Sequence, residues 1–183
     1  MNHDPRRPRI GISRCLLGDE VRYDGAHKRD SLLLDVFGPH VEWVPVCPEV
    51  EVGMGTPREP IQLVASRDGV PSADERVRLV GVQSRKDWTE QMRAWADQRV
   101  RELADLKLSG YILKKDSPSC GMDAVPVRHR EDVTRTGRGL FAQALMDALP
   151  DLPVEDEARL RDAAIRERFI ERVFAYHRVG SSG

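Results

Sequence analysis

Residues 111–121 read YILKKDSPSCG, an apolar stretch that runs into a polar loop and ends just beyond a cysteine. The apolar residues predict a short buried strand, and Cys120 lies in the loop beyond its carboxyl end. Two earlier segments have the same order of features, a predicted strand followed by a cysteine: 8–13 with Cys15 and 41–46 with Cys47. This repeated arrangement organises the interpretation of the whole chain.

Helical patterns separate the predicted strands, which is typical of right-handed crossovers and a parallel sheet. Helices are expected after the N-cap residue Asp30, over 87–107, over 139–149 and after the N-cap residue Asp162. Further strands are expected at 78–83 and 150–154. Pro45 indicates an edge or irregular position in its strand, and residues 49–75 are expected to form a long loop. The expected fold class is α/β, a Rossmann-like three-layer sandwich with a mainly parallel sheet, as a single domain plus a C-terminal helix.

The composition of the 183 residues is that of an ordinary soluble globular domain, with 40% hydrophobic residues, 32% charged residues and a net charge of −1. This charge gives no global attraction for nucleic acid, and no apolar run approaches the ~18 residues of a membrane span. No apolar signal-peptide run is present, so we expect a cytoplasmic protein. Four regions are expected: an N-terminal tail at 1–8, one domain at 9–153, a helical extension at 154–178 and a flexible or tag-derived tail at 179–183.

Three cysteines are an odd number for a chain expected in the cytoplasm, which argues against a disulfide framework. Their spacing is unlike the local CxxC patterns of zinc and redox sites, and the five histidines show no ligand-like spacing. The carboxyl ends of parallel strands share one edge of a sheet, where ligands bind, so we expect Cys15, Cys47 and Cys120 to cluster there. The alternative is three unrelated buried thiols.

Three blocks of sequence carry a resemblance to a known family: IGISRCLLGDEVRYDG at 10–25, VCPEVEVGMGTPR at 46–58 and YILKKDSPSCG at 111–121. In this order, over roughly residues 9–150, they resemble the thiouracil desulfidase family. The resemblance implies a [4Fe-4S] cluster held by three cysteine ligands, with one open iron that has no protein ligand. It also implies non-redox replacement of a thiocarbonyl sulfur by oxygen, with release of sulfide. The implied ligands are Cys15, Cys47 and Cys120.

Under this resemblance, water attack on the thiocarbonyl carbon needs a general base, and Glu49, two residues after Cys47, is the favoured candidate. The alternative is a structural role, in which Glu49 is the ion-pair partner of Arg58 or Arg14.

Four further polar residues are candidates for the site. Ser117 and Ser119 either donate hydrogen bonds to cluster sulfides or substrate, or only cap their turn. Asp24 has either a catalytic or substrate role, or is only a turn residue. Lys114, at the end of a predicted strand, either meets a developing negative charge or is simply solvated.

Residues 152–176 resemble the segment that, in longer relatives, leads into a second helical domain. The longer relatives act on thiolated uridine in tRNA, and the small ones act on free thiouracil. The chain is therefore either a naturally short member or the N-terminal part of a longer tRNA 4-thiouridine desulfidase. We expect a small thiolated pyrimidine base or nucleoside as the substrate, with only weak, salt-sensitive action on tRNA.

Two other functions are compatible with the same residues. One is a cluster-dependent hydro-lyase, because an open iron also binds a hydroxyl leaving group. The other is a non-catalytic metal-binding or regulatory module, in which the cysteines hold zinc or an intact cluster. The short glycine stretches at 53–55 and 137–139 lack the full dinucleotide fingerprint, so NAD binding is not expected.

Overall fold

The computed structural model describes residues 7–65 and 77–180. Parts of the two expected tails, 1–6 and 181–183, lie outside the described residues, as do residues 66–76, which include the end of the expected loop. Within the described ranges, no helix is both long and apolar enough to cross a membrane.

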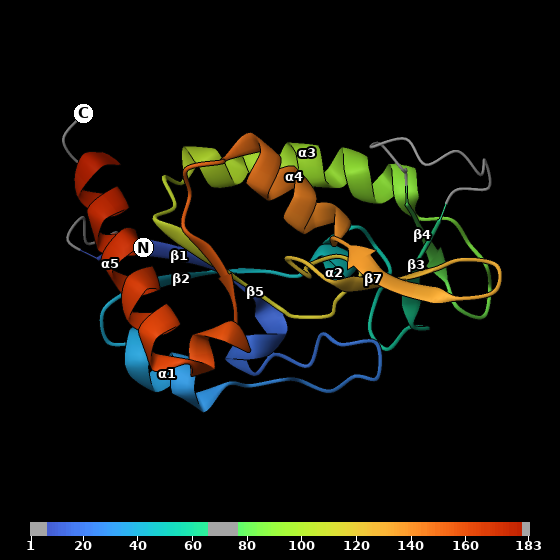
Figure 1. Ribbon diagram of the computed structural model, residues 1–183, viewed down its shortest axis with the longest axis horizontal. Helices are drawn as coiled ribbons and strands as arrows, with labels where there is room; N and C mark the ends of the chain where they lie inside the picture. Colours follow the sequence, from blue (N-terminus) through green and yellow to red (C-terminus); the bar gives the residue numbers. More distant parts are fainter. Residues whose placement is uncertain (1–6, 66–76, 181–183) are drawn as a thin grey trace.

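A four-stranded sheet forms the centre of the molecule (Figure 1). Its strands are, in spatial order, β2 (Glu42–Val46), β1 (Arg9–Ser13), β5 (Gly110–Leu113) and β8 (Val154–Asp156). Each pair of neighbouring strands is parallel, which confirms the expected parallel sheet. Pro45 lies in the edge strand β2, where a residue without an N–H group is tolerated.

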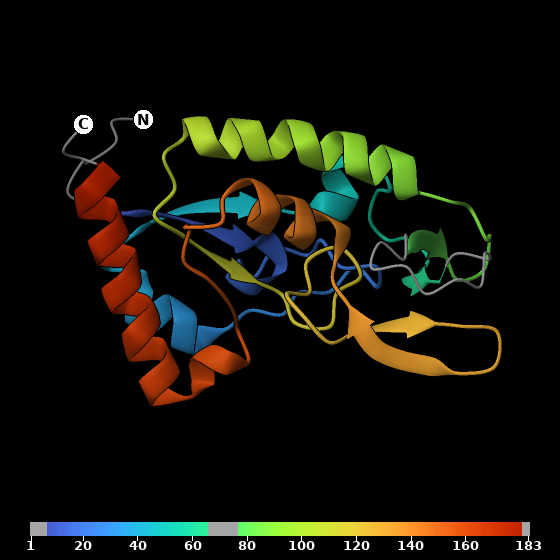
Figure 2. The ribbon, with the colours of Figure 1, turned by 45° about the horizontal axis from the view of Figure 1, so that its top comes forward.

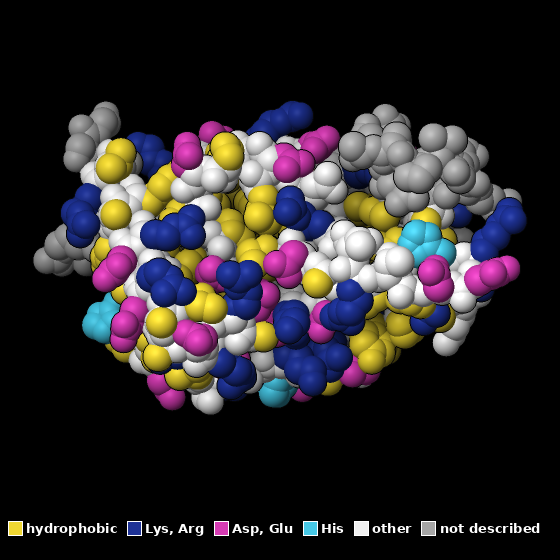
Figure 3. Space-filling view, in the orientation of Figure 1, with side chains coloured by type: hydrophobic (Ala, Val, Ile, Leu, Met, Phe, Trp, Pro, Cys, Tyr) yellow, Lys and Arg dark blue, Asp and Glu magenta, His cyan; other side chains and the backbone are white. Residues whose placement is uncertain are grey.

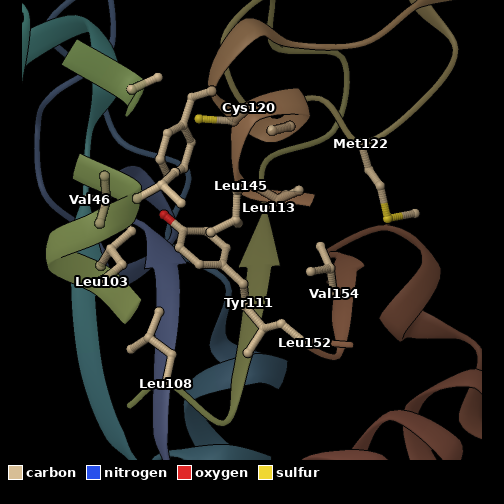
Figure 4. Packing of buried hydrophobic residues seen from close by; sticks show 14 residues of the cluster. Val46, Leu103, Leu108, Tyr111, Leu113, Cys120, Met122, Leu145, Leu152 and Val154 are labelled. Carbon is tan, nitrogen blue, oxygen red and sulfur yellow. The ribbon is translucent and has the colours of Figure 1, made fainter. Parts of the chain in front are cut away.

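Helices cover both faces of this sheet (Figure 2). They are α3 (Thr89–Asp105) and α4 (Leu140–Ala148) on one face, and α1 (Ser31–Phe37) and α5 (Ala163–Gly180) on the other. Alternate residues of β5 serve the two faces: Tyr111 and Leu113 pack with α3 and α4 (Figure 4), and Ile112 packs with α1 and α5. The helix–sheet–helix arrangement confirms the expected three-layer sandwich.

Two helices begin where the sequence predicts. The Oδ1 atom of Asp30 accepts the N–H of Leu33 at 3.2 Å, and Oδ1 of Asp162 accepts the N–H of Ile165 at 3.0 Å. The last strand is shifted from its expected position at 150–154, because the N–H of Leu152 bonds back to the carbonyl of Leu149 and residues 150–152 form a turn.

A second four-stranded sheet was not expected from the sequence. Its spatial order is β4 (Arg78–Gly81), β3 (Ile61–Val64), β6 (Val125–Arg128) and β7 (Val133–Gly137). The prediction of an unbroken loop at 49–75 was wrong, since this segment contains β3 and most of the short helix α2 (Pro48–Glu51). These elements are four residues each, too short for a periodic pattern, and they are stabilised by a separate core around Leu63, Leu79 and Val125.

The boundary expected between residues 153 and 154 falls immediately before β8. After β8 the chain passes through a short 3-10 helix, η2 (Arg159–Arg161), and continues into α5. Phe169 and Val173 of α5 are buried in the core beneath β1 and β5. The C-terminal segment therefore supplies both a strand and a covering helix to the parallel sheet.

Candidate functional site

A cavity of about 310 Å³ lies beyond the carboxyl ends of β1, β2 and β5, and all three cysteines line it. Cys15 lies in the short 3-10 helix η1 (Arg14–Leu17) after β1, and Cys47 is the N-cap residue of α2 after β2. Cys120 lies in the loop after β5. Cys47 and Cys120 are buried and Cys15 is half-buried. The structure thus brings together three thiols that are far apart in the sequence.

The loop that carries Cys120 is held in shape by Ser117. The Ser117 Oγ atom accepts the backbone N–H groups of Ser119 at 3.2 Å and Cys120 at 3.1 Å, and its carbonyl accepts the N–H of Gly121 at 2.7 Å. The start of α4 packs against the same loop: a Cβ atom at Gly139 would lie 2.7 Å from the Cys120 nitrogen. Only glycine at this position leaves room for the loop.

The position of Cys47 depends on two residues that sequence reasoning missed. The N–H of Cys47 donates to Oε1 of Glu51 at 3.0 Å, and Oε2 of Glu51 is paired with Arg99 of α3 at 3.2 Å. A signal for this local helix was present in the sequence, because Pro48 directly after a strand is typical of the first residue of a helix.

Burial makes all three thiols hard to ionise. It raises the pKa of Cys15 to about 11 and that of Cys47 to about 12, and it raises the pKa of Cys120 well above its ordinary value. The negative charge of Glu49 raises each of these pKa values further. A cationic group in the cavity is what would stabilise three thiolates together.

Glu49 is buried at the centre of a hydrogen-bond network. Its Oε1 atom accepts the hydroxyl of Ser119 at 2.8 Å and lies 3.4 Å from the hydroxyl of Ser117. Its Oε2 atom lies 3.5 Å from the Cys47 sulfur and 3.9 Å from Nη2 of Arg58. The structure therefore brings together a carboxylate, two serines and a cysteine, as the sequence predicts for a site.

The structure also bears on the structural alternative for Glu49. Arg58 is close to Glu49, but its Nη1 atom also donates to the carbonyls of Val21 and Gly55, each at 2.9 Å. Arg14 instead forms an ion pair with Asp19, so the pairing of Arg14 with Glu49 was wrong.

Lys114 lines the cavity, and its ammonium group is paired with Glu157. Glu157 also accepts the N–H of Lys115 at 2.7 Å, so this residue of the C-terminal segment fixes the end of β5. Sequence reasoning missed Glu157, which is 43 positions from Lys114 and has no distinguishing pattern.

Asp24 is not among the residues that line the cavity. Its Oδ1 atom accepts the N–H of Ala26 at 3.1 Å, which is an Asx turn, and its Oδ2 atom accepts from Nη1 of Arg22 at 3.0 Å. Asp24 is therefore separated from Glu49 and the cysteines, although Arg22 and Tyr23 beside it do line the cavity.

The spacing of the acidic and sulfur ligands bears on what the cavity can hold. In the described part of the chain, no three His, Cys, Asp or Glu side chains are grouped closely enough to hold one metal ion. A single zinc ion needs all its ligands within about 2.0–2.3 Å of one point. An iron–sulfur cluster binds each cysteine through a different iron, so its ligand sulfurs lie further apart.

Comparison with known proteins adds a family and two relatives. A family model described as 2-thiouracil desulfurase matches residues 10–157. The uncharacterized protein YbbK of Bacillus subtilis (strain 168) is 30% identical over 139 residues, which are 76% of this chain and 90% of that protein. The solved structure of a [4Fe-4S]-dependent thiouracil desulfidase, TudS, is 27% identical, with a TM-score of 0.66 over 88% of this chain and 99% of TudS.

Proposed function

The chain belongs to the 2-thiouracil desulfurase family, and we propose that it uses a [4Fe-4S] cluster to replace the thiocarbonyl sulfur of a thiolated pyrimidine by oxygen, with release of sulfide. The family resemblance expected from the sequence is confirmed by the match over residues 10–157. The observation that carries the proposal is that Glu49 lines the same cavity as the three cysteines.

Cys15, Cys47 and Cys120 are the proposed cluster ligands. They come from the ends of three parallel strands and line one cavity, and their spacing does not suit a single ion. Three thiolates leave one of four irons without a protein ligand. When bound, the cluster supplies a Lewis-acidic iron with high affinity for sulfur.

The proposed reaction consumes one water and releases one hydrogen sulfide. The water oxygen bonds to the thiocarbonyl carbon, the carbon–sulfur bond breaks, and no electrons are gained or lost. Glu49 takes a proton from the attacking water and returns it to the departing sulfide. The hydroxyls of Ser119 and Ser117 hold Oε1 of Glu49, which leaves Oε2, on the side of Cys47, to accept the proton.

Lys114 is proposed to stabilise negative charge that develops on the substrate. Its ammonium group lines the cavity and is held there by Glu157. A cavity of about 310 Å³ is at the small end of ligand sites, which favours a single pyrimidine or nucleoside. Thiouracil and thiouridine are therefore the proposed substrates, and tRNA 4-thiouridine is expected to react weakly.

The test begins with anaerobic reconstitution of the purified chain with iron and sulfide. A cysteine-ligated cluster gives broad absorbance near ~400 nm and bound iron and sulfide, and zinc gives neither. Sulfide release is then measured with 2-thiouracil and 4-thiouracil. A cluster with no sulfide release from any thiopyrimidine would favour the hydro-lyase or the regulatory module, and failure of the chain to bind iron would overturn the proposal.

A further inference from the structure

Tyr23 lines the cavity, but the proposed reaction gives it no role. Its side chain belongs to the segment VRYDG at 21–25, in the loop between β1 and α1. Tyr23 is 42% exposed, which makes it one of the few large hydrophobic side chains of the described residues that are open to solvent. An aromatic ring left open at a cavity is a feature that needs an explanation.

The other aromatic side chains have structural partners elsewhere. Ring contacts among the described residues join Phe37 with Trp43 and Phe169, and Phe141 with Trp95 and Tyr111. None of these contacts involves Tyr23, and no other aromatic residue lines the cavity in the described part of the chain. Tyr23 is thus the one ring available there to a bound ligand.

Neighbouring residues fix the position of this ring. The guanidinium carbon of Arg22 lies over the Tyr23 ring, 5.3 Å from its centroid, within the range of a cation–π contact. Asp24 holds that guanidinium at 3.0 Å and also closes the turn through the N–H of Ala26. On the other side, the Tyr23 carbonyl accepts the N–H of Arg58 at 2.9 Å.

We infer that Tyr23 is a substrate-recognition residue whose ring stacks on the pyrimidine of the thiolated substrate, and that Asp24 is a positioning residue that acts through Arg22. This inference rests on the proposed function, since it names how that site recognises its substrate. A pyrimidine offers a flat π-face whether it is a free base or part of a nucleoside, so stacking suits both. Arg22 covers one side of the ring and keeps it from turning away from the cavity.

Removal of the ring should weaken binding without changing the chemistry. Stacking of a base on an aromatic side chain corresponds to about a tenfold change in affinity, within a wide range. We expect Tyr23→Leu to raise KM about tenfold, to leave kcat within about twofold and to leave the cluster absorbance unchanged. Tyr23→Phe keeps the ring and should behave like the unaltered enzyme.

Equilibrium binding of uracil, the reaction product, gives a readout that does not depend on turnover. Calorimetry should show the same loss of affinity for Tyr23→Leu and none for Tyr23→Phe. Asp24→Asn keeps the turn acceptor but removes the charge that holds Arg22. It should raise KM in the unaltered background and have no further effect in the Tyr23→Leu background.

The outcomes separate this inference from the proposed function. If the reconstituted, unaltered chain releases no sulfide from any thiopyrimidine, the proposed function is wrong and the stacking role falls with it. If that chain is active but Tyr23→Leu leaves KM and uracil affinity unchanged, the stacking role alone is wrong. Loss of bound iron in Tyr23→Leu, or a Tyr23→Phe variant as weak as Tyr23→Leu, would also overturn it.

Discussion

The hydroxyl of Ser119 donates a 2.8 Å hydrogen bond to Oε1 of Glu49, a residue 70 positions earlier in the chain. Ser119 is fully buried and directly precedes Cys120, and Glu49 follows Cys47 by two residues. The bond therefore ties two of the cysteine-bearing segments together through the carboxylate between them. A change in either partner should be felt at the site, in a way that depends on which atom is lost.

Glu49→Gln tests the carboxylate as a general base. The amide keeps the shape of the side chain but cannot take a proton from water, so we expect iron content to be retained and kcat to fall at least ~100-fold. Glu90→Gln on the exposed side of α3 is the matched control and should have normal activity, since its side chain is 87% exposed. Iron loss in Glu49→Gln as severe as in Cys47→Ser would make Glu49 structural instead.

Ser119→Ala and Ser117→Ala should differ, although they lie two residues apart. Ser119→Ala removes a donor to a buried carboxylate and should lower both kcat and the free energy of unfolding, the latter by about 1–3 kcal/mol. Ser117→Ala instead frees the N–H groups of Ser119 and Cys120, so its main effect should be faster iron loss. The measurements are kcat, denaturant unfolding and iron retention under dialysis. Equal iron loss in the two variants would contradict this division of roles.

Gly139→Ala should displace the loop that holds Cys120. Gly139 has ordinary backbone angles, φ −62° and ψ 140°, so alanine is disfavoured only by the backbone atoms of Ser119 and Cys120 that its Cβ would meet. We expect lower iron content after reconstitution and a free energy of unfolding reduced by about 1–3 kcal/mol. Gln143→Ala, exposed one turn later in α4, is the control. Full iron loading of Gly139→Ala would show that the loop tolerates the shift.

Tyr111 offers a stability test away from the cavity. Its side chain is fully buried, packed against Phe141 (Figure 4), and its hydroxyl has no hydrogen-bond partner among the described residues. Tyr111→Phe should leave the free energy of unfolding unchanged or raise it by up to about 1 kcal/mol, because an unsatisfied buried hydroxyl is removed. Phe141→Ala should instead lower it by about 3–5 kcal/mol. Denaturant unfolding checks both, and clear destabilisation by Tyr111→Phe would mean that its hydroxyl has a partner.

The sequence predicted the parts of this protein that follow from local pattern. Strands that end at a cysteine, the N-cap residues Asp30 and Asp162, and Pro45 on an edge strand all depend on neighbours in the chain. The second sheet did not emerge because its short strands are held by tertiary packing around Leu63.

Side-chain partners far apart in sequence were also beyond prediction. Glu51 with Arg99 and Glu157 with Lys114 read as solvated charges in the sequence, and only the fold brings each pair together. The same limit applies to Asp24, whose residue type suits catalysis, but whose distance from the cavity depends on how its turn closes.

Substrate size is the last expectation to test. Figure 3 shows Lys and Arg side chains gathered over the loop between β1 and α1, a surface that could attract phosphate. Much of this charge is already paired, however: Arg22 with Asp24, Arg14 with Asp19 and Arg135 with Asp116. The net charge of the chain is only −1, so no long-range attraction to RNA adds to it.

We therefore expect faster sulfide release from 2-thiouracil and 4-thiouridine than from thiolated tRNA. Turnover on the small substrates should be nearly independent of salt, because a neutral ring entering a small cavity displaces few counterions. Turnover on tRNA should fall steeply between about 50 mM and 200 mM salt. The comparison is kcat/KM for each substrate at both salt concentrations. A higher, salt-insensitive kcat/KM on tRNA would mean that this chain recognises the polymer, because such a result needs contacts to the folded RNA beyond its phosphates.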